Sequence, residues 1–178
     1  MKHPAVLSKA HREIDDHAPT LSTPIRYTES IAQLPYTSAC VKEAMRLFPS
    51  TGFSLPRHSP PEGLTISGTF IPPGWRVGCN PCIVHYDTTV FGDDASSFRP
   101  ERWLVSETRS REMEKYLLMF GSGTRTCLGK NIALVELCTV VPEIIRGFEI
   151  EMGEGAEWDV EDMWFRKQRG VVVNIKRR

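Results

Sequence analysis

A single cysteine that follows a glycine-rich stretch constrains this chain more than any other feature. Residues 120–129 read Phe-Gly-Ser-Gly-Thr-Arg-Thr-Cys-Leu-Gly, and an apolar segment over 128–146 follows with the composition of a long helix. Glycine adopts backbone angles closed to other residues, so this loop can turn back on itself and approach a flat ligand closely. Cys127 would lie at the start of the helix, where unpaired N–H groups and the positive end of the helix dipole favour a thiolate. The loop is therefore expected to present one thiolate to a metal.

One thiolate excludes the usual structural zinc cages, which take four protein ligands from paired motifs. The nearest other cysteine to Cys127 is Cys138, inside the expected helix. Haem meets the requirement, because the porphyrin supplies four nitrogens and the protein supplies an axial ligand. Arg125 could pair with a haem propionate. The simpler alternative is a glycine-rich turn that holds a buried, inert cysteine before a helix.

Residues 120–129 match every fixed position of the signature Phe-x-x-Gly-x-Arg-x-Cys-x-Gly, so the chain resembles the cytochrome P-450 monooxygenases. Two further motifs stand in the order of that family, Glu43-Ala-Met-Arg46 and the segment 98–103 with the sequence Phe-Arg-Pro-Glu-Arg-Trp. The pieces that join them are Leu55-Pro56-Arg57, Ile71-Pro72-Pro73-Gly74 and Phe91-Gly92. The resemblance runs from about residue 4 to the end of the chain and is greatest to fungal microsomal members.

The resemblance implies a haem b site built on the loop 120–129. Cys127 would be the axial ligand of the iron, Phe120 would pack beside the sulfur, and the N–H groups of Leu128 and Gly129 would hydrogen-bond to it. The full set of implied haem-binding residues is Phe120, Gly121, Arg125, Cys127, Leu128, Gly129 and Arg57, with the two arginines on the propionates. Possible substrate contacts are Thr51, Gly52, Phe53 and Phe165. No catalytic residue is assigned, because the oxygen-activating helix of the family has no counterpart in this sequence.

Glu43, Arg46 and Arg102 are expected to form a structural charge triad, as the resemblance implies. Residues at i and i+3 share a helix face, but such pairs are usually exposed and contribute only about 0.2–0.5 kcal/mol. The pair Glu143 and Arg146 has the same spacing. What distinguishes the first pair is its otherwise apolar helix, where the charges would be costly unless paired.

The expected fold is mainly α with a small antiparallel β-sheet, an α+β arrangement that forms one incomplete domain over 1–178, the C-terminal part of the P-450 fold. The spacing of apolar residues, with prolines and glycines marking the ends, predicts helices over 4–16 and 35–47 and a long helix after Cys127. The same signals predict a small sheet within 50–80, an ordered meander over 87–119, and strands over 148–152 and 171–175. The second helix is expected to bury Leu34, Val41, Ala44, Met45 and Phe48. In the meander, burial is expected for Phe91, Phe98, Trp103 and Leu104.

Composition excludes several classes of partner. The 22 basic and 22 acidic residues balance, which gives no reason to expect nucleic acid or an anionic membrane surface. The sequence has no apolar run of the length of a membrane span and no signal peptide. The full-length family member is expected on the cytosolic face of the endoplasmic reticulum membrane, held by an N-terminal anchor that this sequence lacks, so that this chain alone would be cytoplasmic.

The expected function is that of a fragment of a haem-thiolate monooxygenase, which inserts one atom of dioxygen into a small organic substrate. Electrons would come from NADPH through a cytochrome reductase. Asp87-Thr88-Thr89 imitates part of the family's missing central helix, but its position after the sheet assigns it to the family's His-Arg-Asp turn, with Tyr86 in place of arginine. The alternatives are a non-catalytic truncated remnant, or a zinc or redox module that uses Cys79, Cys82 and His85.

Overall fold

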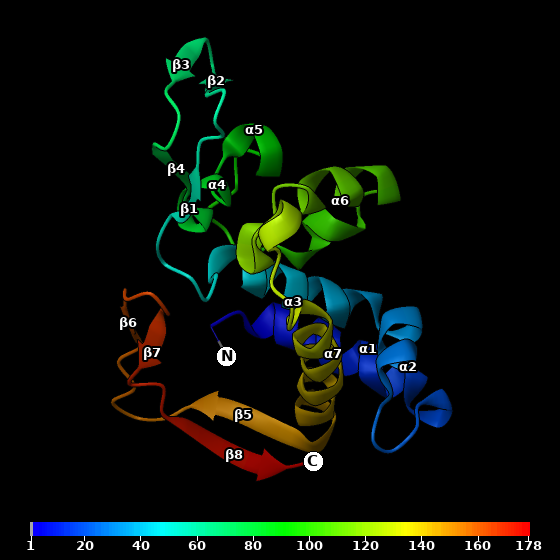
Figure 1. Cartoon of the computed structure of the whole chain (residues 1–178). Helices are drawn as coiled ribbons and strands as arrows, with labels where there is room; N and C mark the ends of the chain where they lie inside the picture. The colour runs from blue at the N-terminus through cyan, green and yellow to red at the C-terminus, as the bar shows by residue number, and fades with distance from the viewer. Residues whose placement is uncertain (1) are drawn as a thin grey trace.

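Four helices lie side by side in the lower right part of the view in Figure 1. The computed structural model describes residues 2–178. The cluster consists of α1 (Pro4–His17), α2 (Tyr27–Gln33), α3 (Pro35–Leu47) and α7 (Lys130–Gly147), with the 3₁₀ turn η1 (Ala18–Thr20) after α1. α3 and α7 contact each other, and each of them also contacts α1 and α2. Ile14, Leu21, Ile25 and Leu34 are buried between them, with Ile145 of α7 packed against this group.

The start of α3 is fixed by a side chain from α1. Both α1 and α3 begin with proline, whose fixed backbone angle suits the first helical turn. The Glu13 carboxylate accepts hydrogen bonds from the N–H groups of Tyr36 at 2.7 Å and Thr37 at 2.8 Å. These groups have no partner inside the helix, so Glu13 both caps α3 and sets its position against α1.

The other side of α3 packs against the meander. This region contains α4 (Pro81–Val84), α5 (Thr88–Phe91), η2 (Pro100–Leu104) and α6 (Glu107–Glu114). Ala39, Phe91, Ala95, Trp103 and Met113 form its buried core. The expected burial of Phe91 and Trp103 is confirmed, whereas Phe98 is only half-buried and Leu104 is 45% exposed. Phe98 stacks instead on His3, with 4.9 Å between ring centroids.

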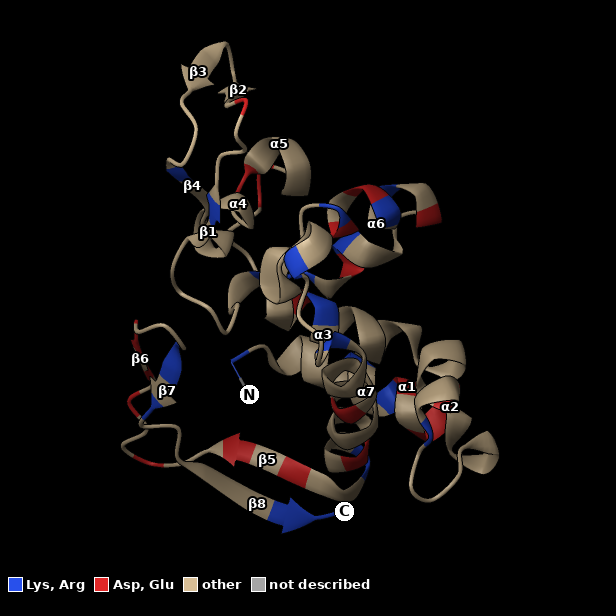
Figure 2. Ribbon diagram, in the orientation of Figure 1, with Lys and Arg blue, Asp and Glu red and all other residues tan. Residues whose placement is uncertain are grey.

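All strands pair in antiparallel two-stranded ribbons. β1 (Leu55–His58) pairs with β4 (Arg76–Cys79), and β2 (Leu64–Ile66) with β3 (Thr69–Ile71), so the antiparallel pairing expected over 50–80 is divided between two ribbons. β5 (Phe148–Met152) pairs with β8 (Val173–Arg177), which begins two residues later than expected, and β6 (Asp159–Glu161) pairs with β7 (Lys167–Arg169). Glu149 lies opposite Lys176, and Figure 2 shows one acidic band of β5 opposite the basic end of β8. Opposite charges at such positions stabilise a ribbon.

Two residues expected in the core, Ala44 and Phe48, are exposed. They line a hollow of about 690 Å³ between α1, α3, α7 and the C-terminal ribbons, together with Met119 and Trp158. Phe48 and Trp158 are in contact there, with ring centroids 5.2 Å apart. The helix pattern correctly places these apolar residues on one face, but the hollow leaves that face only partly covered within residues 2–178.

Several apolar side chains of α7 are also open. Ile132, Val135, Val140 and Ile144 are between 40% and 66% exposed. α2 is not among the helices predicted from the sequence. Among residues 2–178, each helix is too short or too polar to cross a lipid bilayer.

Candidate functional site

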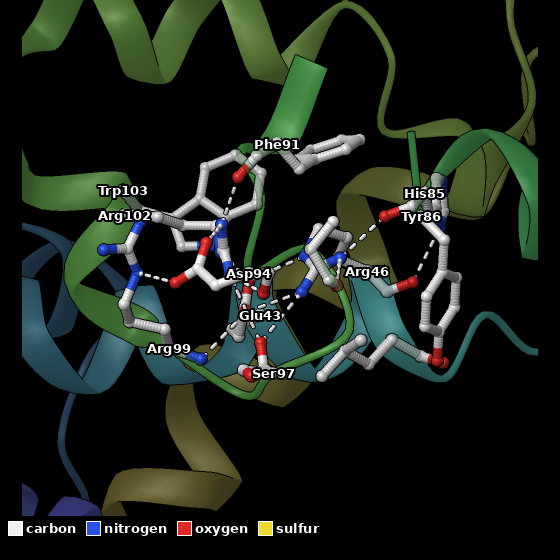
Figure 3. A network of polar contacts seen from close by, with 12 residues as sticks. Glu43, Arg46, His85, Tyr86, Phe91, Asp94, Ser97, Arg99, Arg102 and Trp103 are labelled. Atoms are coloured by element: carbon white, nitrogen blue, oxygen red, sulfur yellow. Dashed lines mark hydrogen bonds and ion pairs between the residues drawn. The ribbon is translucent and has the colours of Figure 1, made fainter. Parts of the chain in front are cut away.

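Glu43 is the centre of a buried charge network (Figure 3). Its side chain is fully buried, and the carboxylate accepts hydrogen bonds from five donors. Arg46 binds both oxygens, through Nη2 at 2.8 Å and Nε at 2.9 Å. Arg102 Nε lies 3.0 Å from Oε1, and the remaining donors are the Arg99 N–H at 3.0 Å and Trp103 Nε1 at 2.9 Å. The structure thus brings together the three residues of the expected triad and adds Trp103, which the sequence left without a polar role.

The same network sets the ionisation of Glu43. Burial opposes a charged carboxylate, but the hydrogen bonds from Arg46 and the Arg99 N–H, with the charges of Arg46 and Arg102, outweigh it. The pKa of Glu43 therefore lies below its usual value of 4.5. At neutral pH one buried carboxylate faces two buried guanidinium groups, and Asp94, 36% exposed, adds a second negative charge at 3.1 Å from Arg102 Nη1.

The two guanidinium groups also hold the backbone of the meander. Arg46 Nη1 donates to the carbonyl oxygens of His85 and Ala95, each at 2.6 Å, and Nη2 donates to that of Ser97 at 3.2 Å. Arg102 donates to the carbonyl oxygens of Phe91, Asp94 and Ser97. Buried carbonyl groups need partners, so these arginines make the irregular segment 85–97 a fixed part of the fold.

Glu143 and Arg146 have the same spacing as Glu43 and Arg46, but they connect different segments of the chain. Glu143 Oε1 accepts from the Ile25 N–H at 2.5 Å and from Arg146 Nη2 at 2.6 Å, while Arg146 Nη1 donates to the Ser22 carbonyl at 2.9 Å. The side chains are 29% and 21% exposed. This pair fastens α7 to the loop before α2 at the edge of the helical cluster.

His85 is fully buried and uses both ring nitrogens for backbone contacts. The Leu118 N–H donates to Nε2 at 2.7 Å, so Nε2 carries no proton, and Nδ1 then donates to the Arg46 carbonyl at 2.7 Å. Burial, together with the charge of Arg46, lowers the pKa of His85 to about 4. The ring is therefore neutral at pH 7 and has no free nitrogen for a metal.

The zinc or redox hypothesis on Cys79, Cys82 and His85 is not supported. The imidazole of His85 is fully engaged, and Cys79 and Cys82 are free thiols. Residues 2–178 contain no group of three or more potential metal-ligating side chains. Asp87 accepts from the Thr89 N–H and caps the short helix α5.

The loop 120–129 turns at its glycines. η3 (Leu118–Phe120) leads into it and η4 (Gly123–Arg125) lies within it. Gly121 and Gly123 have φ angles of 71° and 67°, which disfavour other residues. The Cys127 N–H closes the loop by donating to the Phe120 carbonyl at 2.8 Å.

Cys127 is exposed and lies two residues before Gly129, the N-cap of α7, so the helix begins at Lys130 rather than at the expected position of about 128. A Cβ on Gly129 would lie 3.8 Å from the Cys127 sulfur, so Gly129 lies directly beside the thiol. Phe120 is half-buried and Leu128 is fully exposed. The alternative of a buried, inert cysteine is wrong for this structure.

Arg57 and Arg125, expected on the propionates, are both exposed. A Cβ on Gly121 would lie 3.9 Å from Leu55 Cδ1, so strand β1 reaches the loop. Residues two apart on a strand share a face. Arg57 therefore projects from the same face of β1 as Leu55, the side that meets the loop.

The structure also brings the two expected substrate-contacting segments together. Thr51 pairs with Phe165 in an isolated antiparallel bridge, and the Arg166 N–H donates to the Ser50 carbonyl at 2.8 Å. Phe53 stacks on Trp164 with centroids 6.5 Å apart, and Phe53 and Phe165 are 50% and 60% exposed. A Cβ on Gly52 would meet the Met163 carbonyl at 3.1 Å, so glycine permits this close approach.

The residues around Cys127 fit a metal complex in which most of the metal's ligands come from the cofactor rather than from the protein. The loop offers one open thiol with a glycine beside it, and no second ligating side chain completes a metal site there within residues 2–178. A single exposed thiol of this kind suits the class of proteins that hold a metal complex through one cysteine.

The comparisons with known proteins agree with this class. The sequence model of the family described as Cytochrome P-450 matches residues 1–177, and this chain belongs to the cytochrome P-450 family. Members of this family carry haem. The resemblance to fungal members and the α+β fold class are thereby confirmed.

The chain is similar to several fungal monooxygenases. It is 41% identical to the cytochrome P-450 monooxygenase ACRTS1 of Alternaria alternata, over 100% of this chain and 48% of that protein. It is also 41% identical to the cytochrome P-450 monooxygenase gsfF of Penicillium aethiopicum, over 98% of this chain and 35% of that protein. Pisatin demethylase of Fusarium vanettenii is 41% identical over 93% of this chain and 32% of its own length. The chain thus spans between about a third and a half of the length of these relatives.

Proposed function

We propose that this chain is the haem-binding portion of a monooxygenase, with Cys127 as the axial ligand of the iron. The observation that carries the proposal is the open thiol of Cys127 at the start of α7, on a glycine-turned loop with no other ligating side chain. In the complete protein, haem held by a thiolate would supply the activation of dioxygen, from which one oxygen atom enters an organic substrate and the other leaves as water. Residues 1–178 would form one part of that larger domain.

Each loop residue has a role in this proposal. Phe120 packs beside the sulfur, and Gly121 lets β1 approach the loop. The N–H groups of Leu128 and Gly129 stand next to the thiolate at the start of α7 and lower its electron density by hydrogen bonding. Arg125 and Arg57 bind the propionates, which suits two exposed guanidinium groups on adjoining segments.

The substrate side would be formed by Thr51, Gly52, Phe53 and Phe165. Their support is the bridge between Thr51 and Phe165 and the exposed aromatic rings around it. Such a surface suits a small, largely apolar organic molecule, because aromatic side chains bury apolar area and leave few polar groups unpaired.

Electrons would come from NADPH through a partner cytochrome reductase that docks beside the loop, near Arg125 and Lys130. Both cations are exposed there. In reductase-supported turnover of the complete protein, Lys130→Glu should reduce the rate, while peroxide-supported turnover stays unchanged. The complete protein is proposed to lie on the cytosolic face of the endoplasmic reticulum membrane.

The proposal is tested by titrating the purified chain with hemin and recording the ferrous-carbonyl absorption spectrum. The unmutated chain should bind one haem and give the long-wavelength band of thiolate ligation. Cys127→Ser should abolish that band, while Cys79→Ser, which changes another exposed cysteine, should keep it. A chain that takes up no haem, as expected of a remnant, or a Cys127→Ser variant that keeps the thiolate band, would refute the proposal.

A further inference from the structure

We infer that His85 is a positioning residue that holds the ligand loop 120–129 at a fixed place relative to α3. The inference rests on the proposed function, since it concerns how the Cys127 thiol is placed for haem. His85 follows α4 and lies far from Cys127 in the sequence, and it makes no contact with the loop's cysteine. Its effect is transmitted through Leu118.

The first half of the connection joins His85 to α3. Nδ1 donates to the Arg46 carbonyl at 2.7 Å, and Arg46 Nη1 donates back to the His85 carbonyl at 2.6 Å. Arg46 lies in the last turn of α3, where carbonyl groups have no partner within the helix. The hydroxyl of Tyr86 donates to the next carbonyl, that of Leu47, at 3.5 Å. The end of α3 is therefore bound to the segment 85–86 on both sides.

The second half joins His85 to the loop. Nε2 accepts from the Leu118 N–H at 2.7 Å. The Leu118 carbonyl accepts from the Gly121 N–H at 2.9 Å, and the Phe120 carbonyl accepts from the Cys127 N–H at 2.8 Å. Leu118 thus begins a series of short-range hydrogen bonds that ends at the ligand cysteine. A displacement of Leu118 would displace Cys127 with it.

Side chains on the loop itself could not serve this purpose equally well. Residues 121–129 are exposed or only half-buried, so packing fixes them weakly. His85 is fully buried between α3 and Phe91, whose ring meets the imidazole edge-on with centroids 6.4 Å apart. Its ring is therefore held in place, and Arg46 is the charged group that faces it. Groups that hydrogen-bond directly to a metal ligand typically change metal binding about 10- to 100-fold when they are removed, and His85, which acts through Leu118, is expected at the lower end of that range.

Two substitutions separate the two halves of the connection. The terminal amide of glutamine in His85→Gln can reach the Nε2 position and accept from Leu118, but it loses the donor to Arg46. The shorter amide in His85→Asn can keep the donor to Arg46, but it cannot reach Leu118. Both variants should unfold more readily, whereas only the asparagine variant should release the loop.

The experiment measures two properties of the whole chain. The first is hydrogen exchange of the Leu118 amide without haem, which should be roughly tenfold faster in His85→Asn than in His85→Gln, since a protecting hydrogen bond is lost. The second is the ferrous-carbonyl spectrum at equal haem content, where His85→Asn should lose most of the thiolate band and bind hemin roughly tenfold more weakly, while His85→Gln keeps both. Equal exchange and equal spectra in the two variants would overturn the inference. If the unmutated chain binds no haem, the proposed function fails, and the exchange measurement still decides whether His85 holds Leu118.

Discussion

The Oε1 atom of Glu43 on α3 lies 3.0 Å from the Nε atom of Arg102, which is 59 residues further along the chain. Both side chains are almost completely excluded from solvent. Removing ions from water costs several kcal/mol each, so the pair persists only because every polar atom around it is occupied. The contact joins α3 to the meander, and the ligand loop follows the meander directly in the sequence.

Glu43→Gln should lower the free energy of unfolding by about 3–5 kcal/mol. The amide keeps the shape of the carboxylate, but it leaves two buried guanidinium groups without a partner of opposite charge. Denaturant unfolding of the apo chain measures the effect. The matched control is Glu143→Gln, in the half-exposed pair with Arg146, for which we expect a loss of about 1 kcal/mol. Equal losses in the two variants would show that burial of the network does not increase the free-energy cost of removing its negative charge.

Arg46→Lys should cost at least about 2 kcal/mol of stability although the charge is kept. The guanidinium of Arg46 makes five hydrogen bonds from three nitrogens, and a single ammonium cannot reach all of these acceptors. Haem uptake should fall together with stability. Arg146→Lys serves as the control because its side chain is 21% exposed and can gain water. Normal haem uptake and an unchanged unfolding midpoint in Arg46→Lys would contradict the prediction.

The sequence predicted the parts of this site that depend on local spacing. The loop 120–129, the start of α3 at Pro35 and the strand over 148–152 depend on residues close together in the chain, and the structure places them as expected. The association of Glu43 with Arg102 followed from resemblance alone, since spacing cannot join segments so far apart. Glu43 and Arg46 have the same spacing as Glu143 and Arg146, yet the first pair belongs to a buried network and the second lies at the edge of the helical cluster. Only the surrounding segments distinguish the two pairs.

What the sequence missed depends on tertiary position. The sequence alone allows His85 as a metal ligand, because an isolated histidine near two cysteines gives no sign of the backbone groups that face its ring. The helical pattern of α3 predicts burial of Ala44 and Phe48, but a pattern does not show whether another layer covers that face. α2 was missed because a seven-residue helix close to proline and threonine breakers has too short a periodicity to detect.

The glycines of the ligand loop should respond differently to alanine. Gly123 has a φ angle of 67°, so Gly123→Ala should cost roughly 1–2 kcal/mol of backbone strain and weaken haem binding through the distorted loop. Gly129 has a φ angle of −81°, and a Cβ there would make only ordinary contact with the Cys127 sulfur at 3.8 Å. Gly129→Ala should therefore keep the free energy of unfolding of the apo chain nearly unchanged. Thermal unfolding of both apo variants tests this, and equal losses would show that the positive φ angle is unimportant.

Stability should fall in two separate ranges as the pH is lowered. The folded-state pKa of His85 is lowered from 6.5 to about 4, so unfolded chains bind more protons between these values. The contribution of neutral His85 is complete above pH 6.5 and is lost as the pH falls toward 4. The pKa of Glu43 is also lowered, so its contribution is complete above about 4.5 and is lost only as the pH falls through its folded-state value.

The His85 range can be isolated by comparing the unmutated chain with His85→Gln. The variant retains Glu43 and all other titrating groups, so their effects cancel in the difference between the two free energies of unfolding. That difference should shrink by about 3 kcal/mol as the pH falls from 6.5 to 4, because one pKa unit corresponds to about 1.4 kcal/mol. Urea unfolding of both apo chains at a series of pH values measures it. A difference that stays constant over this range would mean that the pKa of the imidazole is the same in the folded and unfolded chains. That result is incompatible with a buried ring whose Nε2 accepts a hydrogen bond from the Leu118 N–H.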